Sequence, residues 1–159
     1  MSSFSRLSAL LIVAALLAGC AERGQPLSVT EAPTVQPPQG VACPRAALEN
    51  WLQHSSNLTQ ELSDLVNQNI AIQPQRANEV IDQAGSIQAA LAAARPPECA
   101  AQHAAALNQA LDLTEAYFSA YRQGRATDPV GSLTRINSAL DEARALEAEL
   151  TRLYEALPR

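Results

Sequence analysis

The chain contains no lysine, and aromatic residues make up only 4% of its 159 residues. All of its basic residues other than two histidines are therefore arginines. Hydrophobic residues nevertheless amount to 47%, and many of them are alanines. This composition favours helices that pack closely through small side chains, because a β-fold requires more Val, Ile, Tyr and Phe. The length allows one folded domain.

Motifs for several kinds of chemistry are also missing. No Cys-x-x-Cys pair is present to support a redox thiol, and no Cys-x-x-Cys-His to attach haem. No Glu-x-x-His pair is present for a di-iron bundle, and no Gly-x-Ser-x-Gly or glycine-rich phosphate loop occurs. The sequence therefore predicts a protein that is not an enzyme and that has no metal site and no cofactor.

The two histidines, His54 and His103, are the remaining candidates for a metal or haem site. Methionine occurs only at Met1, so haem would need both histidines as axial ligands. Their spacing from the nearest cysteines places them about 10 Å apart along the helix axes. Both also fall outside the apolar stripes, so we expect them on the surface.

The first 19 residues have the features of a secretory signal. Arg6 is their only charge, and an apolar run from Leu7 to Ala18 follows. This run has the length of a signal-peptide core and is too short to span a bilayer. The segment ends in Leu17-Ala18-Gly19-Cys20, which resembles the lipobox of bacterial lipoproteins. The alternative is an ordinary signal peptide followed by an unrelated cysteine.

The lipobox resemblance implies cleavage before Cys20 and attachment of two or three acyl chains to that residue. Several acyl chains together anchor a protein stably to a membrane. Because Ala21 and not aspartate follows the cysteine, the resemblance implies the outer membrane in a host that has one. In other hosts it implies the outer face of the plasma membrane. Either way, the domain lies outside the cytoplasm, in the cell envelope.

Residues 20–42 form the predicted lipidated cysteine and a disordered tether. Their prolines are Pro26, Pro33, Pro37 and Pro38, and they favour a partly polyproline II spacer. A partner-binding role through Pro37-Pro38 is the alternative. From Cys20 onward the chain carries 10 arginines and 16 acidic residues. This negative balance disfavours nucleic acid and electrostatic membrane binding.

Residues 43–159 are predicted to form an all-α, up-down-up-down four-helix bundle with one disulfide. Apolar residues recur every three or four positions within residues 48–66, 77–91, 100–121 and 133–157. Four such stripes bury one another by facing inward, and short connections make neighbouring helices antiparallel.

Proline, aspartate and glycine mark the ends of these helices. Each proline stands where a helix can begin in its first turn: Pro44, Pro74, Pro97 and Pro129. Asp128 is the expected N-cap of the last helix, and Gly124 the expected stop of the helix before it.

Cys43 and Cys99 remain once Cys20 carries lipid, and outside the cytoplasm two such cysteines are expected to pair. They open the first and third helices, which run in the same direction, so both cysteines fall at the same end of the bundle. We interpret the bond as structural.

Two regions are candidates for binding. The aromatic residues Tyr117, Phe118, Tyr121 and Tyr154 either fill the core or line a partner or ligand surface. The Ser55–Asn57 stretch and Gly85 interrupt two helices at similar depth. They mark either a kink with a small pocket or tight packing through small residues.

The leading hypothesis is a non-enzymatic protein-interaction or structural module of the cell envelope, and the alternative is a small-ligand carrier. In architecture the chain resembles the helical pilotin lipoproteins of secretion systems, which combine a lipobox with a small disulfide-bearing bundle. The segment from Pro96 to Tyr121 also resembles parts of uncharacterised exported lipoproteins, which implies no function.

Overall fold

The computed structural model describes residues 42–158. The signal segment, Cys20 and most of the tether lie outside these residues, so their roles remain predictions. Within the described part of the chain, no helix is both long enough and apolar enough to cross a membrane.

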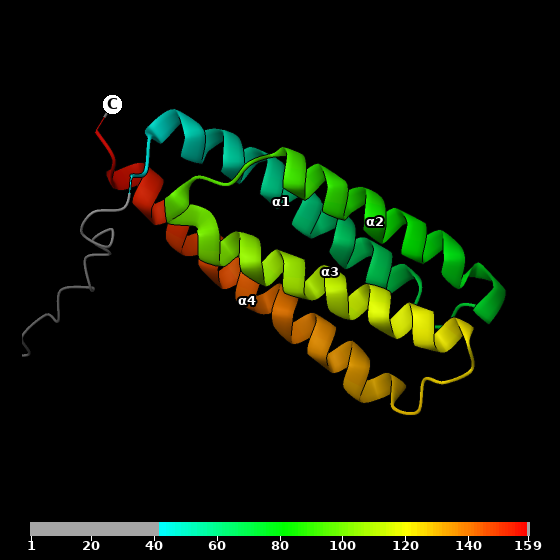
Figure 1. The fold of residues 1–159 in the computed structure, drawn as a ribbon. Helices are drawn as coiled ribbons and strands as arrows, with labels where there is room; N and C mark the ends of the chain where they lie inside the picture. The colour runs from blue at the N-terminus through cyan, green and yellow to red at the C-terminus, as the bar shows by residue number, and fades with distance from the viewer. Residues whose placement is uncertain (1–41, 159) are drawn as a thin grey trace, which may run out of the picture. The chain divides into compact units, whose positions relative to one another are not determined.

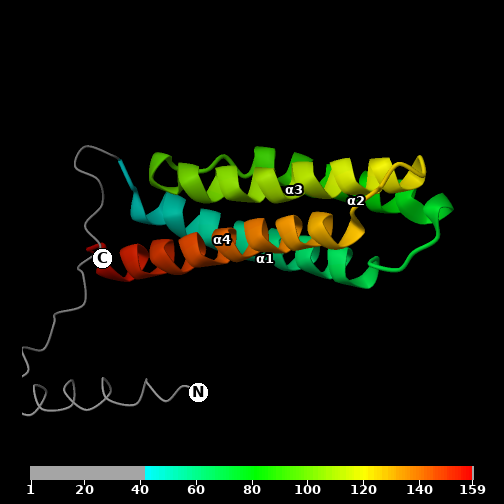
Figure 2. The ribbon, with the colours of Figure 1, turned by 90° about the horizontal axis from the view of Figure 1, so that it is seen from below.

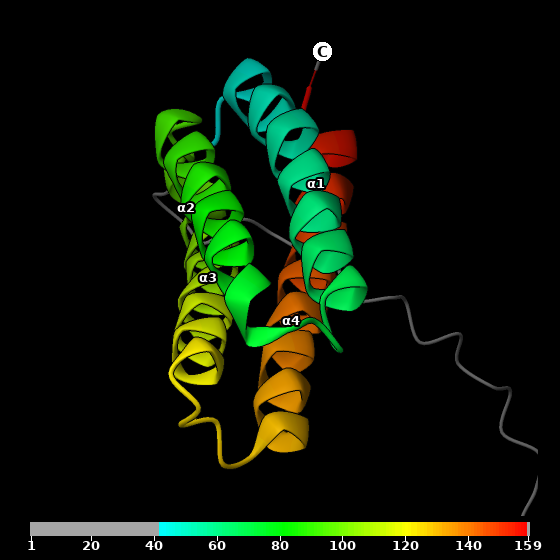
Figure 3. The same ribbon diagram turned by 90° about the vertical axis from the view of Figure 1, so that its right-hand side faces the viewer.

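Four long helices form the domain, and the predicted fold is confirmed: an all-α, up-down-up-down bundle (Figure 1). The helices are α1 (Arg45–Gln68), α2 (Ala77–Ala93), α3 (Ala101–Arg122) and α4 (Pro129–Ala156). Short 3₁₀ turns, η1 (Pro74–Arg76) and η2 (Glu98–Ala100), lead into α2 and α3. Each helix packs on the next, and α4 closes the bundle against α1, as Figures 2 and 3 show from two further directions.

The helix boundaries follow the local signals in the sequence. Pro129 is the first residue of α4, and the Asp128 side chain caps that helix by accepting a hydrogen bond from the Gly131 amide at 2.9 Å. Pro44 stands one residue before α1 and is its N-cap. Gly124 has φ +65°, a conformation that costs glycine little, and it stands two residues beyond the end of α3.

The core consists of the predicted apolar stripes, filled in by alanine. The largest side chains that are almost fully buried are Trp51, Phe118, Leu48, Leu62, Leu107 and Ile136. Ala100, Ala110 and Ala143 are completely buried. Small side chains at these points let neighbouring helix backbones approach closely, so the packing uses the alanine-rich composition directly.

One end of the bundle, which we call the disulfide end, contains Cys43, η2 and the last turn of α4. Cys43 and Cys99 form the predicted disulfide, with their Cα atoms 5.4 Å apart. Arg45, two residues after Cys43, donates hydrogen bonds to the carbonyl oxygens of Tyr154 and Leu157 at 3.0 and 2.5 Å. The chain therefore enters the bundle at a point that is tied both to the α2–α3 connection and to the end of α4.

The opposite end, which we call the turn end, contains the α1–α2 connection (residues 69–76) and the α3–α4 connection (residues 123–128). These two turns come together at the end of the bundle that faces the viewer in Figure 3. The Tyr121 hydroxyl donates a 2.6 Å hydrogen bond to the Ile72 carbonyl oxygen, which ties α3 to the α1–α2 connection.

Candidate docking groove at the turn end

The four aromatic residues of the predicted binding surface lie at two ends of the bundle. Tyr154 belongs to the disulfide end, where the Arg45 guanidinium carbon lies 4.1 Å from its ring centre. Tyr117 lies near the turn end, with its ring centre 4.9 Å from that of Phe118 and 6.0 Å from that of Tyr121.

Burial further restricts what these aromatic residues can contact. Phe118 is only 1% exposed and is a core residue, whereas Tyr121 and Tyr154 are half-buried. Tyr117 is also almost buried, at 6% exposure. Of the two alternatives left open by the sequence, the core therefore holds for Phe118, and the four residues do not form one continuous surface because they lie at different depths and toward opposite ends of the bundle.

His103 is a second correction, because it is 1% exposed and not on the surface. The Trp51 indole Nε1–H donates a 3.0 Å hydrogen bond to His103 Nδ1. Nδ1 is therefore an acceptor, and the ring is neutral with its proton on Nε2. Burial lowers the pKa of His103 from 6.5 to about 4. A buried tryptophan N–H needs an acceptor, and His103 supplies it from another helix, which no apolar spacing in the sequence indicates.

His54 is exposed, as expected, and its Nδ1 donates a 2.8 Å hydrogen bond to the Asn50 carbonyl oxygen. The two histidines therefore occupy different environments, one in solvent and one in the core. Across residues 42–158, no three His, Cys, Asp or Glu side chains gather closely enough to hold a metal ion.

The Ser55–Asn57 and Gly85 interruptions do not break their helices, since α1 and α2 are continuous through them. Ser55 is fully buried, and its Oγ has no hydrogen-bond partner. Gly85 is exposed, and a Cβ atom built there meets nothing within 4 Å. The alternative of tight packing through small residues therefore does not hold at Gly85. Asn57 does line two surface hollows, one on each side of α1.

Three surface grooves are candidates for a binding site. One of about 520 Å³ runs between α1 and α4, and one of about 500 Å³ between α1 and α2. Polar side chains supply most of their walls. The third, of about 270 Å³, lies between α3 and α4 at the turn end, and we call it the turn groove.

The turn groove differs from the other two because one wall is apolar. That wall is a stripe of α3 residues spaced three and four apart: Leu113, Ala116, Tyr117 and Ala120. The α3–α4 connection adds Arg125, Ala126, Thr127 and Asp128, and α4 adds Ser132 and Arg135. An apolar wall with a few convergent polar groups is the usual composition of a binding site.

The polar groups around this groove are not equivalent. Asp128 is already engaged, since it caps α4 and lies 3.9 Å from Arg135 Nη1. Arg135 also donates a 3.0 Å hydrogen bond to the Ser132 hydroxyl. Arg125, in contrast, donates to the neutral side-chain oxygen of Gln123 and takes part in none of the ion pairs found among residues 42–158. Within the described part of the chain, no carboxylate forms an ion pair with it.

Tyr117 connects the groove to the core. Its burial, and to a lesser extent the nearby Tyr121, raise the pKa of its phenol, so the hydroxyl stays protonated at neutral pH. Tyr117, one of the aromatic residues predicted to line a surface, lines the turn groove. Arg125 and Arg135, which line the same groove, were not predicted from the sequence, because the α3–α4 connection that brings them beside α3 follows no periodic pattern.

No family model matches the chain, and it matches neither a curated protein nor a solved structure.

Proposed function

We propose that the chain is a lipid-anchored, extracytoplasmic interaction module of the cell envelope, and that it binds another protein through the turn groove without catalysing a reaction. The observation that carries the proposal is the groove itself, with its apolar wall on α3 and the unneutralised Arg125 at its rim. A docking site needs apolar area for affinity and charged groups for orientation, and this groove offers both.

The position of the groove supports this reading. A tether that ends at Cys43 enters the bundle at the disulfide end, whereas the groove lies at the turn end. An anchor on Cys20 would then leave the groove free to meet a partner. The Cys43–Cys99 disulfide is also typical of proteins that fold in an oxidising compartment outside the cytoplasm.

The anchor and the binding role have separate tests. For the anchor, we expect the full chain to partition with membranes and to incorporate labelled palmitate, and we expect Cys20→Ala to abolish both. If Cys20→Ala leaves membrane partitioning and labelling unchanged, the lipid anchor is wrong, whatever the groove binds.

For the binding role, the full chain is recovered from detergent extracts and compared with the Arg125→Glu/Arg135→Glu variant. We expect a protein that co-purifies with the unmodified chain and is lost with the variant. The matched control is Arg95→Glu/Arg152→Glu, which places the same charge changes on exposed positions that line none of the three grooves. A partner retained by both variants would place the binding surface elsewhere.

The runner-up is a carrier of a small anionic ligand, which the same arginines also favour. The groove volume of about 270 Å³ lies just below the range of roughly 300–1,000 Å³ that is typical of small-molecule sites. A carrier would co-purify with a small molecule that mass spectrometry of the extracted chain detects. The absence of any such molecule, together with a captured protein, would favour the interaction module.

A further inference from the structure

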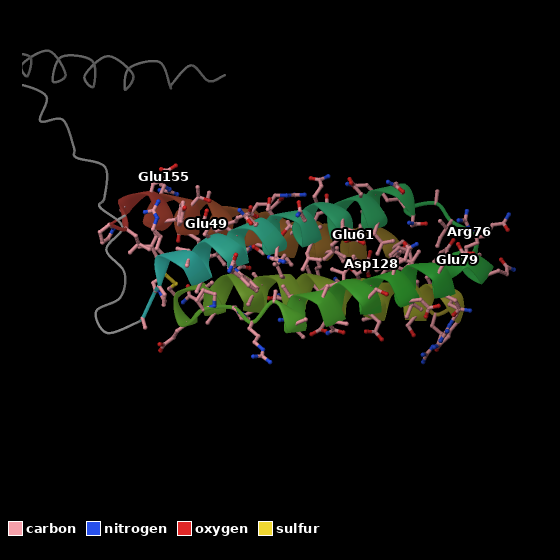
Figure 4. The ribbon with its side chains drawn as sticks, turned by 90° about the horizontal axis from the view of Figure 1, so that it is seen from above. Glu49, Glu61, Arg76, Glu79, Asp128 and Glu155 are labelled. Carbon is pink, nitrogen blue, oxygen red and sulfur yellow. A yellow bond between two sulfur atoms is a disulfide. The ribbon has the colours of Figure 1, made fainter. Side chains whose placement is uncertain are left out.

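Charge is distributed unevenly along the bundle. The turn end together with the helix turns that adjoin it, residues 69–79 and 121–135, holds four arginines and two acidic residues. The other described residues hold four arginines and 12 acidic residues. Figure 4 shows part of this pattern, with Glu49 and Glu155 toward the disulfide end and Arg76 and Glu79 together at the turn end. The turn end is therefore a positive cap on an otherwise acidic bundle.

The arginines of this cap differ in how far they are neutralised. Arg76 pairs with Glu79 at 3.0 Å, and Arg135 lies 3.9 Å from Asp128. Arg122 donates to the Asn78 side-chain oxygen at 2.5 Å, and Arg125 donates to Gln123, so both contact neutral amides. Of the two, Arg125 lines the turn groove. Arg125 is therefore the groove arginine whose charge no ion pair balances, and it lies beside the apolar wall of α3.

The side chains of the wall set the shape of what fits there. Ala116 and Ala120 offer little more than a methyl group each, so a partner's main chain can approach α3 closely. Leu113, which is half-buried, provides a larger apolar surface beside them, and the almost buried Tyr117 closes the wall toward the core. An apolar side chain of a partner would fit against this wall, while a carboxylate next to it would reach Arg125 at the rim.

We propose that the turn groove receives a short acidic segment of a partner protein that carries at least one aliphatic side chain among its carboxylates. This inference rests on the proposed function and names its partner's chemistry. The carboxylates bind Arg125 and Arg135 through charge-assisted hydrogen bonds. The aliphatic side chain packs against Leu113, Ala116 and Ala120.

The acidic remainder of the bundle makes this docking selective. Its net negative charge disfavours an acidic segment along the flanks, so approach at the turn end is favoured. A basic segment would instead be attracted to the acidic flanks and repelled by the arginines at the groove. The charge pattern therefore favours an acidic partner and fixes where that partner binds.

The test uses short synthetic peptides that carry a neutral dye, added to the lipidated full chain in detergent micelles and followed by fluorescence anisotropy. The first peptide alternates Glu and Leu. Matched peptides replace every Glu with Gln or with Lys, or every Leu with Ser. We expect the Glu–Leu peptide to bind, and the matched peptides to bind at least about tenfold more weakly, as the loss of a charge-assisted or apolar contact requires.

Variants of the chain then locate the binding site. Arg125→Gln removes the charge from the rim and should weaken Glu–Leu binding about tenfold, and Arg125→Glu should abolish it. The matched control is Arg152→Gln, an exposed residue of α4 outside the groove, which should change binding by less than about twofold. Circular dichroism and thermal unfolding confirm that each variant is folded.

Three results would overturn the proposal: no binding of the Glu–Leu peptide, equal binding of its Gln–Leu counterpart, or equal weakening by Arg125→Gln and Arg152→Gln. These results leave the detergent-extract experiment unaffected. If that experiment still recovers a protein that depends on Arg125 and Arg135, the proposed interaction function stands, and the partner has a different chemistry. Loss of both peptide binding and partner capture would refute the two together. Rising salt should weaken peptide binding, since screening acts on exposed charges.

Discussion

The two ends of this bundle are built differently. At the disulfide end, the covalent bond joins the start of α1 to the α2–α3 connection. Hydrogen bonds from Arg45 join α1 to the end of α4, and the buried Trp51–His103 pair joins α1 to α3. At the turn end, two loops are held by the Tyr121–Ile72 hydrogen bond and by exposed polar contacts such as Arg122–Asn78. The difference suggests a division of roles, in which one end fixes the fold and the other presents a surface.

A braced entry point also has a mechanical consequence. A pull on the segment that precedes Cys43 acts first on the disulfide and then, through Arg45, on the end of α4. Helix α1 therefore resists being peeled away from the bundle. The turn end carries no such cross-link in the described structure, so changes there are expected to affect binding more than stability.

The largest expected effect comes from removing the disulfide. The bond spans 56 residues, and the chain-entropy model gives about 4 kcal/mol for a loop of that length. We expect the Cys43→Ser/Cys99→Ser variant to lose about this much free energy of unfolding, measured by urea denaturation with circular dichroism. An unchanged free energy would show that the disulfide does not stabilise its end of the bundle.

The second effect is a loss of stability at mildly acidic pH, caused by His103. In the folded state its pKa is about 4, whereas the unfolded value is 6.5, so below pH 6.5 the unfolded chain binds more protons than the folded chain. Stability is therefore complete above pH 6.5 and falls as the pH decreases toward 4. Between pH 7 and pH 5 we expect a loss of about 2 kcal/mol in urea unfolding.

Two histidine variants isolate this contribution. His103→Gln should reduce the dependence of stability on pH between 7 and 5, even though the variant is less stable at pH 7. His54→Gln is the matched control, because His54 is exposed and should leave the dependence unchanged. A dependence that survives in His103→Gln would have to arise from another group.

A third prediction compares one arginine from each end. Arg45→Gln removes hydrogen bonds to two carbonyl oxygens at the end of α4 and should cost about 1 kcal/mol of unfolding free energy. Arg122→Gln removes an exposed contact to Asn78 and should cost less than about 0.5 kcal/mol. Equal losses would contradict the view that the disulfide end is the braced end.

Effects of up to about 1 kcal/mol, with opposite signs, are expected at two glycines. Gly124→Ala forces a side chain into the left-handed region at φ +65° and should cost about 1 kcal/mol at the turn end. Gly85→Ala lies within α2, where a Cβ meets nothing within 4 Å, and should increase stability by about 0.5–1 kcal/mol. Thermal unfolding measures both, and a destabilising Gly85→Ala would show that the glycine has a packing role.

The sequence predicted the fold because its signals are local and repeated. Apolar spacing defined four helices, Asp128 and Gly124 marked helix ends, and the shared direction of α1 and α3 placed Cys43 beside Cys99. His103 was not predicted to be buried, because it is a polar residue whose acceptor role depends on Trp51, 52 residues earlier.

The turn groove was predicted only through Tyr117. Leu113, Ala116 and Ala120 share a helix face with that residue and are recognisable by their spacing once the face is known. Arg125 and Arg135 lie beside this face because of the path of a short irregular connection. No periodicity encodes such a path, so the charged half of the site required the structure.

The most direct test of the turn groove as a docking site is photo-crosslinking in intact cells that produce the full chain. A photoreactive amino acid replaces Thr127 at the rim of the groove or, as the control, Glu149 on α4, which is equally exposed and outside the groove. Our account predicts a discrete cross-linked protein from position 127, none from position 149, and loss of the product in Arg125→Glu. Cross-linking from position 149 but not from position 127 would contradict it and would move the binding surface away from the turn end.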